Sequence, residues 1–484
     1  MVTTIDEAVR RALDTILGLL HADEAMYLLG GAVRDLYLGR PIGDMDLFIQ
    51  TCHPDDLRRR LDAAFSRRIH LHTDPILLRI PISMHAWLDI QYGEERLKAN
   101  LAARDFTINA MALPWPFHDF SSELIDPFGG WDDLRQRRIR AVREKNLTDD
   151  PLRMIRAYRL AAELEFGLDP EVRRSIRQYR DRIKQVAGER IAYELLRWME
   201  GPSVIETLRQ AMEDGLLGTI IPELESTVGC EQGGYHHLDV WGHTLAVLEG
   251  LRRLVETVGS TSYGADFKRW LTKEAFAMSH PRYSFLMFSA LLHDIGKPRV
   301  RKMKRPGLYV FHGHERVGAQ MVRAILEPFR FSRRAGSVVT DLVRFHLEPL
   351  RVMKQDSVEV AATILLRRFG WLAPWLVLLS AADQAGKAGP LVESDRRTRF
   401  RRLTDEVFER YFSGKYEAFP LRGEDLMKHF GLQEGVQLGQ WLKKARRAWE
   451  RYEWTTKEEG LAWLEPRVRA RPKGNKGDLQ DSQE

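Results

Sequence analysis

The sequence predicts a mixed α/β amino-terminal domain followed by an all-α body, and three features support this fold class. Residues 1–145 alternate short strand-like apolar runs with helical segments; the strand candidates are 25–30, 45–50, 68–73, 76–82 and 86–92. Residues 146–227 carry apolar side chains three and four positions apart, the period of a buried helix face. Residues 228–400 continue the helical pattern and are rich in histidine.

The rest of the chain divides in the same way. A small helical cap is predicted for residues 401–465. The tail 466–484 is polar and lacks apolar anchors, so it is predicted to be disordered. A chain of 484 residues is too long for one hydrophobic core, so we expect several domains. Their predicted boundaries are 1–145, 146–227, 228–400 and 401–465, followed by the tail.

Composition excludes several classes of protein. The chain is 44% hydrophobic and 29% charged, and it has no uninterrupted apolar window of eighteen residues, so no membrane span is predicted. The amino terminus reads as an amphipathic helix without the features of a secretion signal. Its two cysteines, Cys52 and Cys230, lack metal-type spacing and favour a reducing compartment, so a cytoplasmic protein is expected.

The charge distribution suggests a polyanionic partner. The formal net charge is +6, and arginines cluster at 135–140, 173–184 and 396–403. Lys and Arg on helical faces suit a phosphodiester backbone, although solvated surface arginine explains any single cluster equally well. RNA is therefore a candidate partner at this stage.

Residues 28–49, LLGGAVRDLYLGRPIGDMDLFI, are the most informative segment. Gly30-Gly31 precede a predicted helix, where backbone N–H groups can approach a phosphate. Asp44 and Asp46 stand two residues apart on a predicted strand, so both carboxylates would face the same side and could share Mg²⁺. Arg34 is available for a triphosphate. A phosphate-holding turn followed by a metal-holding pair of acids predicts nucleotidyl transfer.

Four further segments occur in a fixed order after this one: RDFTINAMAL (104–113), DPFGGWDDLRQRRIR (126–140), DDPLRMIRAYR (149–159) and ERIAYELLRWM (189–199). Together with residues 28–49 they resemble the class II tRNA nucleotidyltransferases and bacterial poly(A) polymerases over about residues 25–225. The resemblance implies an α/β nucleotidyltransferase head, a mixed sheet plus helices, followed by an all-α neck. It implies the tRNA acceptor arm, CTP and ATP as partners, and Mg²⁺ as cofactor.

The resemblance also assigns roles to individual residues. Catalytic Asp44 and Asp46 would hold two Mg²⁺ ions, with Asp89 as a nearby third carboxylate. The nucleotide would be bound by Gly31 and Arg34, and its ribose and triphosphate by Arg104 and Asp105. Asn109, in the same motif as the latter pair, would be structural.

Asp150 and Arg153 match residues that this family uses as a protein template for the base. A carboxylate accepts a hydrogen bond from the exocyclic amine of C or A, and a guanidinium donates to the neighbouring ring nitrogen or carbonyl. Arg156 and Arg159 follow one and two helical turns later and could reach phosphates. A salt-bridged helix surface is the alternative explanation for these two arginines.

The chain departs from the family at three places. Ala103 stands where the family usually has Arg, and Asp149 where it usually has Glu. The segment between Asp89 and Arg104 is short, whereas complete CCA-adding enzymes carry a longer flexible loop that helps to switch the pocket from CTP to ATP. The resemblance thus implies addition of C, with or without a terminal A. An A-adding enzyme or a poly(A) polymerase remains the alternative.

The histidine-rich region contains a second set of candidate ligands in the order H…HD…H…H…D, which resembles the HD phosphohydrolase domain. Neutral imidazoles and carboxylates can bind one or two divalent ions and activate water for phosphoester hydrolysis. The resemblance implies phosphatase and 2′,3′-cyclic phosphodiesterase activities. The expected ligands are His243, His293, Asp294, His314, His346 and Asp383, with His312 a less certain candidate.

A hypothesis of another class makes this HD domain the only working part, with the head a passive RNA-binding module. The retained acids, base-reading pair and triphosphate arginines of the head argue against it.

Overall fold

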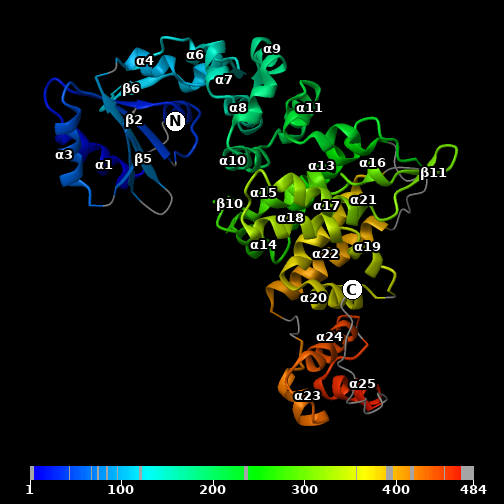
Figure 1. The fold of residues 1–484 in the computed structure, drawn as a ribbon. Helices are drawn as coiled ribbons and strands as arrows, with labels where there is room; N and C mark the ends of the chain where they lie inside the picture. Colours follow the sequence, from blue (N-terminus) through cyan, green and yellow to red (C-terminus); the bar gives the residue numbers. More distant parts are fainter. Residues whose placement is uncertain are drawn as a thin grey trace, which may run out of the picture. The chain divides into compact units, whose positions relative to one another are not determined.

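In the computed structural model the chain forms two compact units, Met1–Pro222 and Glu223–Glu484 (Figure 1). The structure describes residues 5–42, 44–66, 68–73, 76–82, 86–94, 96–118, 123–233, 238–355, 357–387, 396–414, 419–451 and 453–469; within these, it does not describe the side chains of residues 44, 70–77 and 396–397.

A six-stranded mixed sheet forms the centre of the amino-terminal region, with strand order β3-β4-β5-β2-β1-β6. The pair β2–β5 is parallel and the other pairs are antiparallel. All five predicted strands are present. The strands are β1 (Ala25–Leu29), β2 (Asp44–Gln50), β3 (Ile69–Thr73), β4 (Ile76–Pro81), β5 (Trp87–Gly93) and β6 (Ala112–Pro114).

Alternation along the strands gives the sheet two different faces. Met45, Leu47 and Ile49 of β2 belong to the larger core, which the apolar sides of α1 (Glu7–Gly18) and α3 (Pro54–Ala64) cover (Figure 1). Phe48, on the opposite face, packs in a smaller cluster against α4 (Leu97–Ala102). Asp46 has the same parity as Phe48, so it projects on the face of the smaller cluster, away from the main core.

The predicted helical neck belongs to the same compact unit as the sheet. Its central helix α8 (Leu152–Leu164) is apolar enough to be buried on most sides and packs against α10 (Gly188–Trp198) and α11 (Val204–Glu213). The remaining helices of the first unit are α2 (Gly31–Tyr37), η1 (Thr107–Asn109), α6 (Gly130–Arg135), α7 (Glu144–Asp149), α8 (Leu152–Leu164), α9 (Pro170–Tyr179), η2 (Arg180–Gln185), α10 (Gly188–Trp198), α11 (Val204–Glu213), α12 (Leu216–Ile220) and η3 (Pro222–Thr227), which crosses the unit boundary; β7 (Arg138–Ile139) and β8 (Gly167–Leu168) form a short parallel pair.

The second unit is built of helices. Two of them, α15 (Arg282–Leu292) and α21 (Ala373–Ala385), are apolar around nearly their whole circumference and therefore lie in its centre. The helices are α13 (Val240–Val258), α14 (Gly264–Thr272), α15 (Arg282–Leu292), α16 (Lys297–Val300), α17 (His314–Leu326), α18 (Arg333–Phe345), α19 (Glu348–Val352), α20 (Val358–Phe369), η4 (Gly370–Leu372), α21 (Ala373–Ala385), α22 (Arg396–Phe412), α23 (Gly423–Phe430), α24 (Val436–Glu450) and α25 (Lys457–Arg469).

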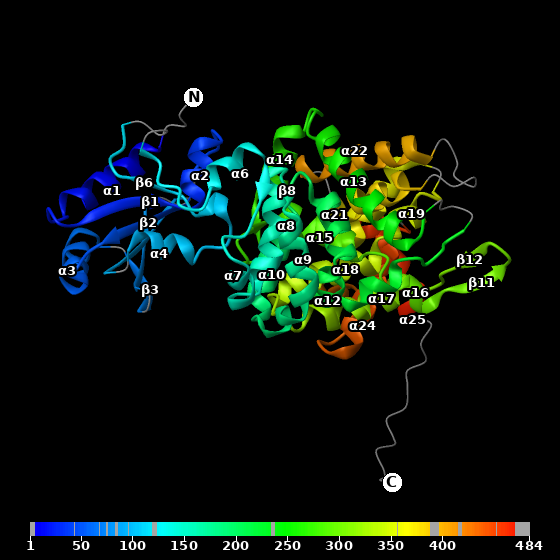
Figure 2. The same cartoon turned by 90° about the horizontal axis from the view of Figure 1, so that it is seen from above.

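Two short hairpins interrupt these helices, and the helical pattern of the sequence predicted neither. The strands β9 (Glu274–Ala275) and β10 (His280–Pro281) form one, and β11 (Lys302–Arg305) and β12 (Leu308–Val310) form the other. Figure 2 shows the β11–β12 hairpin extending from the helices of its unit.

One segment, Val358–Ala385, is long and apolar enough to cross a membrane by length and composition alone. It comprises α20, η4 and α21, is interrupted at Gly370, and has 72% of its most apolar window buried inside the protein. These helices form part of a protein core.

The carboxyl-terminal boundary needs a correction. The sequence predicts a tail from residue 466, but α25 continues through Pro466 to Arg469, and Val468 in this last turn packs against the core of the α23–α25 cap. Residues 470–484 lie outside the described residues.

Candidate functional site

The turn between β1 and α2 brings an arginine against an acid of β2. Gly30 has φ +66°, and a Cβ there would lie 2.2 Å from Arg104 Nη1 and 3.1 Å from Asp46 Oδ2. Arg104 Nη1 donates a 3.0 Å hydrogen bond to Asp46 Oδ2. Gly31 begins α2, and a Cβ there would meet the Arg34 side chain at 3.5 Å, an ordinary contact. The strict requirement for glycine is thus at Gly30, whereas the resemblance assigned the nucleotide contact to Gly31.

Asp46 has the properties of a metal ligand. Its side chain is 45% exposed, and its Oδ1 makes no hydrogen bond within the described residues. Asp89 lies beside it in register on β5, but both oxygens of Asp89 accept hydrogen bonds from Arg79, at 2.7 and 2.6 Å. The side chain of Asp44, two residues before Asp46 in β2, lies outside the described residues. An accessible carboxylate with an unengaged oxygen fits a hard divalent cation.

A chain of hydrogen bonds connects α2 to α8. Arg34 donates to both oxygens of Asp35 and, through Nη1, to Asn109 Oδ1 at 2.8 Å. Asn109 Nδ2 donates to Asp105 Oδ1 at 3.0 Å, and Arg156 donates twice to Asp105 Oδ2, at 3.0 and 2.8 Å. Burial alone would raise the pKa of Asp105, but Arg156 and Asn109 hold it well below its usual range. Three of the expected nucleotide-binding residues therefore lie in one network, joined by Asn109.

The same network continues into the neck. Glu194 of α10 accepts from Arg156 Nη1 at 3.3 Å and from Arg159 Nε at 2.6 Å. Arg159 Nη1 then donates to Glu163 Oε2 at 2.6 Å, and Arg40 Nη2 donates to Glu163 Oε1 at 3.4 Å. Arg159 is thus buried and paired with two glutamates, rather than part of the salt-bridged helix surface that the alternative explanation described, while Arg156 joins Asp105 to Glu194.

The two expected base-reading residues lie together at the start of α8. Asp150 accepts from Arg190 Nη1 and Nη2 of α10, at 3.4 and 3.0 Å. Arg153 Nη2 donates to the carbonyl of Ala103 at 2.8 Å. Sequence reasoning named neither Arg190 nor Glu194 as a site residue, although their motif was recognised, because their partners lie about forty residues away along the chain.

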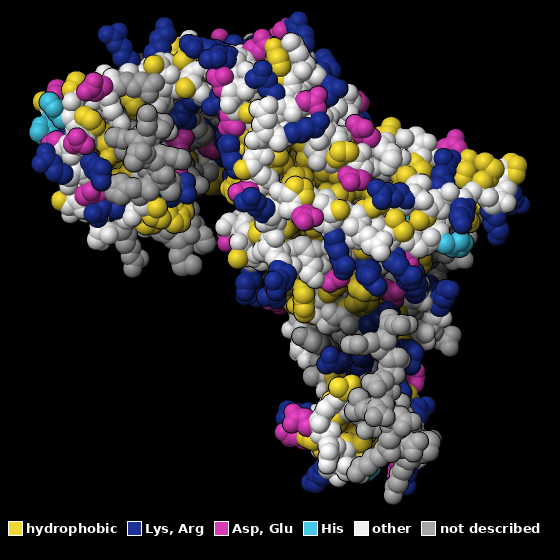
Figure 3. All heavy atoms as spheres, in the orientation of Figure 1, with side chains coloured by type: hydrophobic (Ala, Val, Ile, Leu, Met, Phe, Trp, Pro, Cys, Tyr) yellow, Lys and Arg dark blue, Asp and Glu magenta, His cyan; other side chains and the backbone are white. Residues whose placement is uncertain are grey.

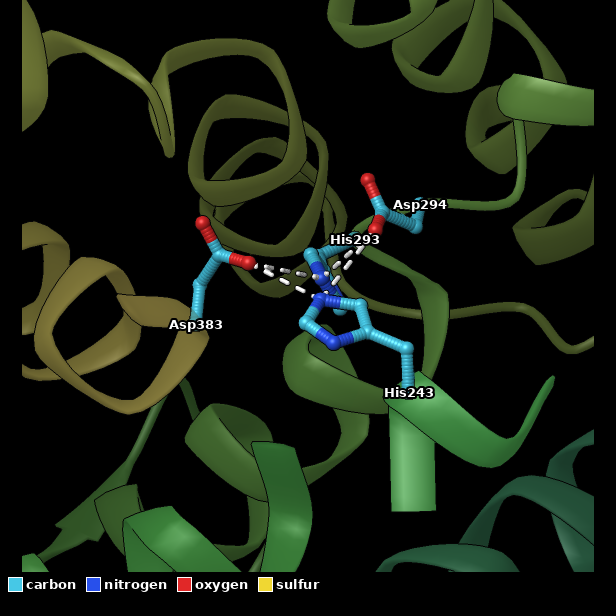
Figure 4. Close-up of side chains that lie close together, drawn as sticks. All are labelled: His243, His293, Asp294 and Asp383. Carbon is cyan, nitrogen blue, oxygen red and sulfur yellow. Dashed lines mark hydrogen bonds and ion pairs between the residues drawn. The ribbon is translucent and has the colours of Figure 1, made fainter. Parts of the chain in front are cut away.

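In the second unit, four expected ligands from three helical segments point toward one another (Figure 4). His243 Nε2 of α13 lies 2.9 Å from Asp383 Oδ1 of α21 and 3.6 Å from Asp294 Oδ2. His293 Nε2, just after α15, lies 3.1 Å from Asp294 Oδ2 and 4.0 Å from Asp383 Oδ1. All four side chains are buried.

The other oxygen of Asp294 faces a second group of ligands. Asp294 Oδ1 lies 3.2 Å from His314 Nε2 and 3.9 Å from His346 Nε2, and these two nitrogens are 3.3 Å apart. One carboxylate thus belongs to both groups, an arrangement that can hold two bridged cations. His312 is exposed and belongs to neither group.

The protonation of the histidines suits metal binding. In His293, His314 and His346, Nδ1 lies 2.7, 2.8 and 2.7 Å from the backbone carbonyl three residues earlier. A carbonyl only accepts, so Nδ1 carries the proton and each Nε2 is left to present a lone pair. Burial lowers the pKa of His346 to about 3, which keeps it neutral. The buried Nε2 of His293 faces the acidic ligands Asp294 and Asp383 of the same group, as expected of a metal ligand.

Two lysines, which the sequence analysis did not single out, contact the acidic ligands. Lys297 Nζ lies 2.6 Å from Asp294 Oδ2, and Lys387 Nζ lies 2.7 Å from Asp383 Oδ2. Burial alone would raise the pKa of both acids, yet the nearby histidines and lysines hold each pKa well below its usual range. A cavity of about 490 Å³ opens onto this centre, lined by both lysines and by Tyr309 of the β11–β12 hairpin. The lining thus combines the acidic and histidine ligands with Lys297, Lys304, Arg351 and Lys387, and these cations could neutralise a bound anion.

Family models match three parts of the chain. Residues 26–90 and 84–140 match the poly A polymerase head domain, residues 165–227 match a probable RNA and SrmB-binding site of polymerase A, and residues 240–371 match the HD domain.

Full-length relatives are also found. The chain is 34% identical to a CC-adding tRNA nucleotidyltransferase of Thermus thermophilus, over 90% of this chain and 92% of that protein. It is 30% identical to an A-adding tRNA nucleotidyltransferase of Deinococcus radiodurans, over 90% of this chain and 94% of that protein.

Solved structures share the fold. The CCA-adding enzyme of Bacillus stearothermophilus in complex with CTP has a TM-score of 0.62 and 22% identity, covering 96% of this chain and 98% of that one. The Thermotoga maritima CCA-adding enzyme complexed with tRNA has a TM-score of 0.60 and 16% identity, covering 96% of both chains.

Proposed function

Because this chain belongs to the family of tRNA nucleotidyltransferases, we propose that it adds two cytidylates from CTP to the 3′ end of tRNA and then stops. The enzyme would act in the cytoplasm, where its unfinished tRNA substrates are found. A separate enzyme would add the terminal adenylate.

The observation that carries this proposal is the short connection after β5. This strand ends at Gly93 and α4 begins at Leu97, so three residues replace the longer flexible segment that complete CCA-adding enzymes carry. Without that segment the base-reading pair Asp150 and Arg153 has no built-in means of switching from CTP to ATP. The likeness to a CC-adding enzyme over nearly the full length supports the same conclusion.

In this proposal Asp44 and Asp46 hold Mg²⁺, which supplies the charge that activates the RNA 3′-hydroxyl and stabilises the departing pyrophosphate. Arg104, which donates to Asp46 Oδ2, would contact the triphosphate. Asp150 and Arg153 exchange their present contacts with Arg190 and the Ala103 carbonyl for the amine and ring edge of cytosine.

Single-nucleotide extension tests the proposal. Purified protein is incubated with Mg²⁺, tRNA lacking its terminal CCA, and one NTP at a time. Extension by two nucleotides with CTP, no third addition when ATP follows, and no extension with ATP alone are the expected results. Addition of A to tRNA ending in CC would instead identify a CCA-adding or A-adding enzyme, and indefinite ATP polymerisation a poly(A) polymerase.

A second function is supported by the metal centre of the other unit. We propose that His243, His293, Asp294, His314, His346 and Asp383 bind divalent ions and that this centre hydrolyses phosphoesters. A phosphomonoesterase and 2′,3′-cyclic phosphodiesterase assay across Mg²⁺, Mn²⁺, Co²⁺ and Ni²⁺ identifies the active metal.

Two variants separate the activities. His293→Ala should abolish hydrolysis and leave CTP incorporation unchanged, whereas Asp46→Asn should abolish incorporation and leave hydrolysis unchanged. Loss of both activities in either variant, with the fold intact by circular dichroism, would contradict the assignment of two independent centres.

A further inference from the structure

The β9–β10 hairpin of the second unit has a strained backbone. Phe276, Ala277 and Ser279 have φ of 63°, 55° and 51°, the left-handed region that costs a non-glycine residue about 1 kcal/mol or more. Ser332, the N-cap of α18, donates from Oγ to the Phe276 carbonyl at 2.9 Å. The start of α18 therefore helps to hold the hairpin in this conformation.

The strained conformation places an aromatic ring beside an exposed indole. The ring centroids of Phe276 and Trp371 are 6.5 Å apart, and the guanidinium of Arg334 lies over both rings, at 5.9 and 5.6 Å from their centroids. The ring centroid of Phe276 also lies 5.0 Å from that of Phe285, which is fully buried. Trp371 is nevertheless 43% exposed, which is unusual for so large an apolar side chain.

The charge at this surface is unbalanced. No ion pair joins Arg334 or its neighbour Arg282 to a carboxylate in the part of the chain that the structure describes. Arg282 Nη1 donates to the Trp270 carbonyl at 3.0 Å, and its guanidinium lies 5.2 Å from the centroid of the Trp270 ring. Burial lowers the pKa of Arg282, Tyr411 raises it and the positive charge of Arg334 lowers it, so the two guanidinium groups repel one another. An anion between them would remove this repulsion. Figure 3 shows Lys and Arg side chains gathered in several places on the visible face of the protein.

We propose that Phe276, Arg282, Arg334 and Trp371 form a binding surface for an unpaired nucleotide of the RNA substrate. A nucleobase stacks on the exposed indole of Trp371, and the adjoining phosphate lies between Arg334 and Arg282. Aromatic faces next to guanidinium groups are the usual means of holding single-stranded RNA. An apolar protein surface would leave both arginines desolvated and unpaired, which disfavours that kind of partner.

This inference rests on the proposed function to the extent that the substrate is RNA. It is tested by measuring the affinity of the full chain for fluorescein-labelled tRNA lacking CCA, and for a short unstructured RNA. The variants are Trp371→Ala, Trp371→Phe and Arg334→Glu, and the matched control is Arg323→Glu, an exposed arginine on α17. Thermal unfolding establishes that each variant is folded.

We expect Trp371→Ala and Arg334→Glu to weaken binding of both RNAs about tenfold, as loss of one stacked base does, while Trp371→Phe and Arg323→Glu stay near wild type. The KM for tRNA should rise with little change in kcat or in the KM for CTP. Wild-type affinity in Trp371→Ala, or equal weakening in Arg323→Glu, would overturn the inference. CTP incorporation by the wild-type chain is scored separately, so failure of the proposed function would be recognised independently.

Discussion

At the scale of single residues, Gly30 controls the position of Arg104. The φ of +66° and the 2.2 Å approach of Arg104 Nη1 leave no space for a Cβ. Gly30→Ala should displace Arg104 from Asp46 and lower CTP incorporation more than tenfold. Gly18→Ala, where a Cβ meets nothing within 4 Å, is the control and should incorporate CTP normally. Normal incorporation by Gly30→Ala would show that the contact between Arg104 and Asp46 is dispensable.

Glu194 is a second residue of the first unit for which we predict a large effect, here on the free energy of unfolding. Its side chain is 4% exposed and accepts from both Arg156 and Arg159. Glu194→Gln removes the charge that balances two arginines, so the free energy of unfolding should fall by about 3 kcal/mol, as when one partner of a buried ion pair is lost. Urea denaturation measures the change.

The control for this prediction is Glu206→Gln. Glu206 also pairs with an arginine, Arg209, but both side chains are at least half exposed, so the loss should stay below about 1 kcal/mol. Equal losses in the two variants would mean that burial of Glu194 contributes nothing.

At the scale of elements, the attachment of the α23–α25 cap depends on Arg367 of α20. Its buried Nη1 donates to the carbonyls of Trp449 and Trp454 at 3.2 Å each, close to the carboxyl end of α24. The guanidinium also lies 4.5 Å from the centroid of Trp449. One side chain thus joins α20 to a carbonyl in the last turn of α24 and to a carbonyl of the loop that follows it.

Arg367→Met should accordingly loosen the cap. We expect faster amide exchange in α24 by about tenfold or more, with exchange in α13 and α15 unchanged, because about 2 kcal/mol of charge-assisted hydrogen bonding is lost. Arg402→Met, an exposed position on α22, is the control. Unchanged exchange in α24 would show that apolar packing alone holds the cap.

At the scale of the whole molecule, buried carboxylates make the first unit sensitive to acid. Burial alone would raise the pKa of Glu24, but hydrogen bonds from Arg60 and Thr51 lower it to about 2. The pKa values of Asp105, Glu163 and Asp214 are also lowered, through their arginine partners, although burial opposes this. Acids whose pKa is lower in the folded state stabilise it above their ordinary pKa near 4, and this contribution is lost as pH falls through the folded value.

The free energy of unfolding should therefore be steady from about pH 7 to pH 5 and fall steeply between about pH 4 and pH 2. Urea denaturation across this range, with hydrogen exchange of the β1 and β2 amides as the local probe, measures it. Glu24→Gln should flatten the fall, because its side chain no longer titrates. A curve of unchanged slope in this variant would assign the acid sensitivity to other groups.

Much of this organisation could be predicted from local patterns. Strand alternation located β1 to β5, and the order of histidines and acids identified six side chains that converge on one centre. The three-residue strand β6 was missed because it is stabilised by pairing with β1, eighty-five residues earlier, rather than by a pattern of its own. The sequence analysis did not single out Arg190 and Lys387 for the same reason. A basic residue in a polar stretch looks like a surface residue until the structure shows which acid it contacts.

The amino-acid sequence by itself determined the fold class, and it predicted the two acids of β2 and the six side chains of the candidate metal centre. Hydrophobic periodicity and the chemical type of each side chain are local properties of the sequence, so they can be read without the tertiary structure. The tertiary structure alone decided which charges meet: that Asp89 binds Arg79, that Arg159 is buried against Glu194, and that Asp294 belongs to both ligand groups. Electrostatic and hydrogen-bond energies depend on distances of a few ångströms between side chains, and only the packed chain sets those distances.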